Sequence, residues 1–212
     1  MGRREENKRR TREALIETGL ALFRDHGFEQ TRVQDIVERV GVSPATFFNY
    51  FPTKDAILEA QAEQATDLYA ALLRHEVERS EASVAARLEQ ITRVLAHALG
   101  SDPAISRLMI TRTTLFFGSS GPKADKDRAS QRLLADLFAQ GQASAEIDPA
   151  ADPLQLAELY GATLMLTTIN WLTNWWGDHA QPLDERLLEA VRILMDGARS
   201  HPYPAGRERD RA

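Results

Sequence analysis

The chain has 212 residues, 43% of them hydrophobic and 27% charged, a composition that suits a globular protein of one large domain or two modest ones. It contains no cysteine, which excludes disulfide bonds, thiolate metal sites and cysteine nucleophiles. Residues 1–13 are charged and lack the apolar stretch of a secretory signal, so we expect a cytoplasmic protein.

Basic side chains are concentrated at the N-terminus, although the net charge of the whole chain is −5. Residues 1–12, the basic arm, contain six basic and two acidic side chains. Such a local excess favours contact with phosphate, while the acidic remainder would be repelled by a polyanion. The alternative is a solvated basic tail without a function.

A helix is expected over residues 6–25, and the segment after it, residues 31–54, has the sequence TRVQDIVERVGVSPATFFNYFPTK. Thr31 is the predicted N-cap of a short helix. Apolar residues then recur with spacings i, i+3, i+4 and i+7 from Val33 to Val40, and Gly41 can adopt the positive φ that ends a helix.

A second short helix is predicted directly afterwards, with Ser43 as N-cap and Pro44 in its first turn. Two helices joined so tightly cross at a steep angle, which predicts a helix-turn-helix. Phe47 and Phe51 share one face and are expected to fix this helix in its domain, which leaves Phe48 pointing away. The alternative is an ordinary corner between two helices of a bundle.

Three short patterns carry a resemblance to a known family. They are T-x-x-x-x-I at 31–36, G-V-S at 41–43 and T-F-F-N-Y-F-x-x-K at 46–54, preceded at 19–28 by a variant of A-L-x-L-F-x-x-x-G-F. Together they resemble the DNA-binding domain of the TetR family of bacterial transcriptional regulators. Ala45 stands where the family commonly has glycine, and Phe48 where it commonly has tyrosine.

The resemblance implies an all-α fold with an N-terminal three-helix helix-turn-helix domain and a larger C-terminal helical domain for ligand binding and dimerisation. We expect the DNA-binding domain over residues 1–55, with its helix-turn-helix at 31–51. The effector-binding and dimerisation domain is expected over 56–200, and a disordered tail over 201–212. The implied function is that of a homodimeric repressor, which binds a (pseudo)palindromic operator and is released by a small hydrophobic effector.

The predicted contacts with double-stranded DNA follow from side-chain chemistry. Arg32 and Lys54 are expected to bind phosphates, while Gln34 and Asn49 can pair bidentately with adenine and Phe48 can contact a thymine methyl. The complete predicted set is Thr31, Arg32, Gln34, Ser43, Pro44, Ala45, Thr46, Phe48, Asn49, Tyr50 and Lys54.

The rest of the chain is predicted to be helical at 54–78, 83–99, 103–117, 131–142, 152–176 and 184–200, with a loop at 118–127. Residues 159–177 carry no charge, which raises the question of a membrane helix. Six Thr and Asn side chains and the absence of a second such segment favour a helix buried on all sides instead, with one side facing its own core and another facing a symmetry mate. We therefore expect no membrane association.

The last predicted helix has an apolar stripe at Leu187, Val191, Leu194 and Ala198. Two helices from each of two chains could build a four-helix dimer interface along such a stripe.

A small-molecule pocket in the C-terminal domain would need apolar residues with a few polar groups. The candidate ligand-binding residues are Met109, Arg112, Phe116, Phe117, Tyr160, Thr167, Trp171 and Trp175. The alternative is that these side chains simply pack the core.

No catalytic or cofactor pattern is present: the five histidines lack metal-ligand spacing, and neither a G-x-S-x-G elbow nor a phosphate loop occurs. We therefore expect no enzyme activity, no cofactor and no metal. The remaining rival is a helical protein-interaction module without DNA binding, which would lack the steep salt dependence of phosphate contact.

Overall fold

The computed structural model describes residues 2–79, 81–113, 122–174, 177 and 181–199. Over these ranges the secondary structure is helical apart from one isolated β-bridge, between Ile147 and Arg199. The helices are α1 (Arg3–His26), α2 (Val33–Val40), α3 (Pro44–Tyr50), α4 (Asp55–Glu78), α5 (Val84–Gly100), α6 (Pro103–Arg112), α7 (Pro122–Ala143), α8 (Pro153–Thr173) and α9 (Leu183–Ala198). The predicted all-α fold is confirmed.

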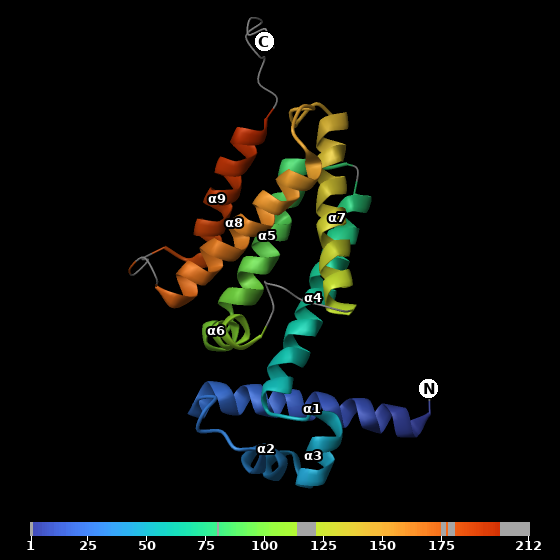
Figure 1. Ribbon diagram of the computed structural model, residues 1–212, viewed down its shortest axis with the longest axis vertical. Helices are drawn as coiled ribbons and strands as arrows, with labels where there is room; N and C mark the ends of the chain where they lie inside the picture. The colour runs from blue at the N-terminus through green and yellow to red at the C-terminus, as the bar shows by residue number, and fades with distance from the viewer. Residues whose placement is uncertain (1, 80, 114–121, 175–176, 178–180, 200–212) are drawn as a thin grey trace, which may run out of the picture.

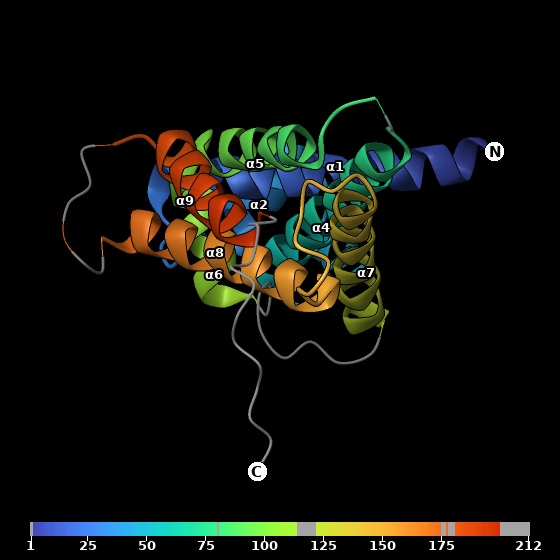
Figure 2. The same cartoon turned by 90° about the horizontal axis from the view of Figure 1, so that it is seen from above.

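The helices form two parts joined by one long helix (Figure 1). Helices α1 to α3 form a small unit at one end, the head, and α4 rises from it into a bundle with α5 to α9. Seen from above, α7 lies beside α4, and α9 lies against α5 and α8 (Figure 2). The head therefore presents α2 and α3 at the end of the molecule opposite the bundle.

Local backbone chemistry explains the turn between α2 and α3. Gly41 ends α2 with φ 78°, a left-handed conformation that glycine adopts without a steric penalty. Ser43 Oγ then accepts a hydrogen bond from the backbone N–H of Thr46 at 3.1 Å, and Pro44 occupies the first turn of α3. These predicted caps are confirmed.

The predicted N-cap of α2 is wrong. The Thr31 hydroxyl donates to the carbonyl oxygens of Gly27 at 2.8 Å and Leu22 at 3.2 Å, so it closes the turn after α1. The residue before α2 is Arg32, whose backbone N–H donates to Asp35 Oδ2 at 2.8 Å.

The hydrophobic core of the head reaches beyond α3. It joins side chains of α1, α2 and α3 to Ile57 of α4 and to Ile105 and Met109 of α6. Gly19 lets α1 approach α4 closely, since a Cβ there would lie 2.6 Å from Ile57 Cδ1. The predicted domain boundary at residue 55 remains a prediction, but packing ties α6 to the head.

Several predicted bounds in the bundle differ from the structure. Helix α7 begins at Pro122, a residue suited to a first helical turn, so the loop predicted over 118–127 is wrong from 122 onward. Helix α6 ends at Arg112, and α8 ends at Thr173 with Asn174 in the left-handed region. The tail 201–212, predicted to be disordered, lies outside the described residues.

Helix α8 takes up most of the uncharged segment and packs one side against the bundle, with Ala157, Tyr160 and Leu172 at most 1% exposed. Leu159 and Leu166 are 47% and 48% exposed, so within its own chain the helix is not buried on all sides. In the described part of the chain, no helix combines the length and the hydropathy needed to cross a membrane.

Candidate nucleic-acid interface

Helix α3 separates buried from exposed side chains within one turn. Phe47 is fully buried, whereas the neighbouring Phe48 is 53% exposed. The rings of Phe47 and Phe51 pack together with their centroids 5.8 Å apart. The Phe48 ring contacts the Phe47 ring edge-on, with their centroids 5.4 Å apart. The buried aromatics therefore hold α3 firmly while Phe48 stays available to a partner.

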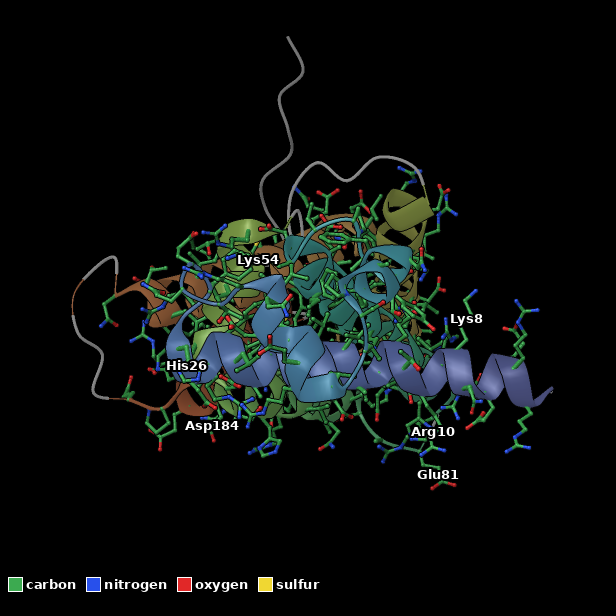
Figure 3. The ribbon with its side chains drawn as sticks, turned by 90° about the horizontal axis from the view of Figure 1, so that it is seen from below. Lys8, Arg10, His26, Lys54, Glu81 and Asp184 are labelled. Carbon is green, nitrogen blue, oxygen red and sulfur yellow. The ribbon has the colours of Figure 1, made fainter. Side chains whose placement is uncertain are left out.

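The predicted base-contacting residues of α3 share this exposed surface, which Figure 3 views from below. Ser43, Pro44, Ala45 and Asn49 are exposed, and Thr46 and Tyr50 are half-buried beside them. Small side chains at the start of the helix allow its backbone to approach a major groove closely. The structure thus brings the predicted α3 residues together on one surface.

On α2, the predicted contact residues Arg32 and Gln34 are also exposed. The Gln34 amide nitrogen donates to Glu38 Oε1 at 2.7 Å, one helical turn further on. Base contact by Gln34 would have to replace this hydrogen bond.

Two predicted contact residues face inward, and the sequence-based interpretation is corrected for them. Thr31 is 3% exposed and hydrogen-bonded inside the head. Lys54 Nζ donates to the carbonyl oxygens of Phe28 at 2.6 Å and Thr31 at 3.2 Å, and lies 4.3 Å from the centroid of the Phe28 ring. Lys54, labelled in Figure 3, therefore holds the turn between α1 and α2 rather than presenting its charge to a phosphate.

A groove lies between the start of α1 and α3, and the sequence analysis did not predict its α1 side. Its volume is about 480 Å³. The lining residues are Arg4, Glu5, Asn7, Lys8, Thr11, Thr46, Asn49 and Tyr50. The positive charge of the basic arm pointed to this region in the sequence, but composition alone does not show which of its side chains face α3.

The predicted effector residues that the structure describes lie in different surroundings. Tyr160 is fully buried, and its hydroxyl lies 2.9 Å from Thr92 Oγ1 and 3.2 Å from the Leu88 carbonyl oxygen. Burial raises the pKa of Tyr160 above its usual value, and burial also raises that of Tyr69. Tyr160 is thus a hydrogen-bonded core residue.

Met109 and Arg112 lie at the joint with the head, where Arg112 lines a cavity of about 380 Å³ with Asp55 and Thr111, and their assignment to an effector pocket stays a prediction. Met109 belongs to the core of the head. Arg112 forms ion pairs with Glu29 and Asp55, and its guanidinium carbon lies 4.2 Å from the centroid of the Phe28 ring. These contacts connect the end of α6 to the head.

The remaining effector candidates lie on α8 or outside the described residues. Thr167 and Trp171 are half-buried, and Trp171 Nε1 donates to the Gln181 carbonyl oxygen at 3.2 Å. Phe116, Phe117 and Trp175 lie outside the described residues.

The predicted dimer stripe of α9 packs within its own chain. Leu187, Val191 and Ala198 are at most 6% exposed in the bundle core, and Leu194 packs against that core. A helix of period 3.6 must give one apolar face to its own core, and this stripe is that face. The prediction that it forms the interface is therefore wrong.

Several apolar and small side chains remain exposed on α8 and α9. Leu159 is 47% exposed, Leu166 48% and Ile193 68%, with the small residues Ala162 and Gly197 also exposed. We call these five residues the outer face.

Comparison with known proteins gives one family and several relatives. Residues 15–60 match the model of a family described as "Bacterial regulatory proteins, tetR family". The chain is 27% identical over 164 residues to the HTH-type transcriptional repressor ComR of Escherichia coli K12, a match covering 75% of this chain and 78% of that protein. It is 25% identical over 189 residues to the HTH-type transcriptional repressor KstR of Rhodococcus jostii, covering 89% and 84%.

Among solved structures, one similar fold is that of Thermus thermophilus FadR, a TetR-family transcriptional repressor in complex with lauroyl-CoA. The TM-score is 0.64 at 23% identity, covering 92% of this chain and all of that one. At this identity the match supports the fold of both head and bundle.

Proposed function

The chain belongs to the TetR family of bacterial regulatory proteins, and from this premise we propose that it is a homodimeric repressor of transcription, released from a two-fold symmetric operator by a small hydrophobic effector. The proposal rests on the structure of α3. Phe48 and Asn49 are exposed on this helix, which is capped at its N-terminus and fixed in the head by buried Phe47. A helix held in this way suits entry into the major groove.

Base contact is proposed for Pro44, Ala45, Phe48 and Asn49 of α3, with Gln34 of α2 beside them. Asparagine pairs bidentately with adenine, and the Phe48 ring can contact a thymine methyl. Arg32 is the proposed phosphate contact on α2, because its side chain is exposed next to the N-terminus of that helix.

Dimerisation is proposed through the outer face. Leu159, Leu166 and Ile193 expose apolar surface that a second copy would bury, and Ala162 and Gly197 permit helices to approach closely. A two-fold pairing of α8 and α9 gives a four-helix interface and presents two heads to half-sites about 34–36 Å apart. The protein would act in the cytoplasm, where it can meet the chromosome.

The effector is proposed to bind in the bundle beside α8. The described core there is apolar, and its hydroxyl groups at Thr92 and Tyr160 are hydrogen-bonded to each other. The similar FadR holds lauroyl-CoA, whose acyl chain is apolar. Thr167 and Trp171 are the residues of α8 retained as candidate contacts.

Salt-dependent binding to a selected genomic fragment tests the DNA-binding proposal. We expect the logarithm of the affinity to fall steeply with the logarithm of salt concentration. Asn49→Ala should relax preference at one symmetric pair of base positions, by about 1–3 kcal/mol of discrimination. An affinity independent of salt would instead indicate a protein-interaction module. That alternative is not favoured, because the chain matches most of the length of two proteins named transcriptional repressors.

Sedimentation of one variant tests the proposed interface. Leu166→Asp should convert the dimer to monomers, because a carboxylate would be buried without a partner. Leu68→Asp is the matched control, since Leu68 is 73% exposed and lies on α4, a helix that contributes no residue to the outer face. If both variants remain dimeric, the interface lies elsewhere.

A further inference from the structure

The first turns of α1 extend past the core of the head. The first fully buried side chain of α1 is Leu15, and residues 3–12 are exposed or half-exposed. Arg12, at the end of the basic arm, lies 5.4 Å from the centroid of the Phe51 ring. The side chains before it are largely exposed to solvent, which leaves them available to a partner outside the chain.

The two sides of this helix differ in charge. On one side Arg9 forms ion pairs with Glu6 at 2.8 Å and Glu13 at 3.0 Å, so its charge is balanced. On the other side Arg4 and Lys8 face α3 and take part in no ion pair among the residues that the structure describes. Arg4 and Lys8 therefore place unbalanced positive charge beside α3, whereas Arg10, which also forms no ion pair among the described residues, lies on the other side of α1 from Lys8 (Figure 3).

The groove between α1 and α3 presents donors suited to a phosphodiester. Arg4 and Lys8 supply charged N–H groups, and Thr11 and Thr46 supply hydroxyls. Glu5 is the one acidic residue among the lining side chains. Asn49 lines the groove as well, so the groove is continuous with the surface proposed to contact bases.

The direction of α1 determines which phosphates can reach this groove. Figures 1 and 2 both place the N-terminus of α1 on the side of the molecule opposite α8 and α9. In a dimer formed through the outer face, the two basic arms point away from the two-fold axis. They would then lie over the outer flanks of the operator, beyond the half-sites.

We propose that the groove formed by Arg4, Lys8 and Thr11 with α3 binds the DNA backbone at the outer flank of each half-site, extending the contacted duplex without adding base contacts. This inference rests on the proposed operator binding and dimer orientation. The expected contribution is electrostatic and independent of sequence, because phosphate contacts carry no base information.

The test uses the full-length protein and two operator duplexes, one with long outer flanks and one trimmed at the edges of the half-sites. The variants are the double substitution Arg4→Gln/Lys8→Gln and the matched control Arg9→Gln, which removes a balanced charge from the opposite side of the same helix. Glutamine is a good helix former at all three exposed positions, so folding is preserved.

On the long duplex, the double variant should flatten the slope of log affinity against log salt by about two units per head, with equal loss on all flank sequences. Arg9→Gln should leave the slope nearly unchanged. On the trimmed duplex, wild type and double variant should bind alike.

The proposal is overturned if the double variant keeps the wild-type slope on the long duplex, or if its deficit persists on the trimmed one. Either result can occur while wild-type binding stays salt-dependent and Asn49→Ala still relaxes base preference. In that case operator binding stands and only the flank contact fails. If wild type shows no salt dependence, the proposed function itself fails.

Discussion

The head and the bundle use their aromatic residues in opposite ways. In the head, Phe47 is buried so that its neighbour Phe48 can be exposed, and the division falls between adjacent residues. In the bundle, Tyr160 is buried together with its hydroxyl, which is hydrogen-bonded inside the core. An exposed aromatic on a fixed helix indicates a contact surface, whereas a buried one with satisfied polar atoms indicates structure.

The largest expected effect tests this contrast within the head. Phe47→Ala should destabilise the head by about 3–5 kcal/mol, because a fully buried ring is lost. Phe48→Ala should cost about 1 kcal/mol or less, mainly the edge contact with Phe47, while weakening operator binding. Urea unfolding and DNA titration of both variants measure the difference, and equal destabilisation would contradict the division.

A second prediction compares two cations of the head. Lys54→Ala should lower the free energy of unfolding by about 1.5–3 kcal/mol, because its ammonium group is hydrogen-bonded to carbonyl oxygens. Arg32→Ala should leave stability almost unchanged and flatten the salt slope of DNA binding by about one unit. If Lys54→Ala flattened the slope and left stability intact, Lys54 would be a phosphate contact after all.

The smallest expected effect concerns the bundle. Tyr160→Phe should cost about 0.5–1.5 kcal/mol, since the Thr92 hydroxyl keeps its 2.7 Å hydrogen bond to the Leu88 carbonyl oxygen. The raised pKa of Tyr160 also predicts a pH dependence. Above the usual tyrosine pKa of 10.0 the unfolded chain loses this proton before the folded one, so stability falls as pH rises.

Urea unfolding at about pH 8 and about pH 10.5 measures this dependence. The variant should show a shallower fall in stability than the wild type, with part of the fall remaining because Tyr69 also has a raised pKa. An identical fall in both proteins would mean that Tyr160 ionises as readily in the folded state as in the unfolded one.

Features set by neighbouring residues could be predicted from the sequence. Gly41, Ser43 and Pro44 act on the backbone within a few residues, so the turn between α2 and α3 follows from their chemistry. The exposed position of Phe48 followed from the spacing of Phe47 and Phe51 in the same way. The helix-turn-helix and most of its exposed residues could therefore be predicted from the sequence.

Features set by distant residues could not be predicted. Lys54 contacts carbonyl groups 23 and 26 residues away, and Arg112 forms an ion pair 83 residues away. The apolar stripe of α9 was found correctly, but periodicity does not tell whether a stripe faces its own chain or a partner. Val191, fully buried in its own bundle, shows the difference.

Helix α6 limits how far this protein can be treated as interchangeable modules. Asp102 at its start is paired with Arg24 of α1 at 2.7 Å, Arg112 at its end is paired with Glu29, and Met109 between them completes the core of the head. A chimaera cut after α4 would leave an apolar hole under its transplanted DNA-binding unit. An engineer who exchanges operator specificity in this scaffold should therefore graft the exposed side chains of α3 and leave the backbone of the head in place.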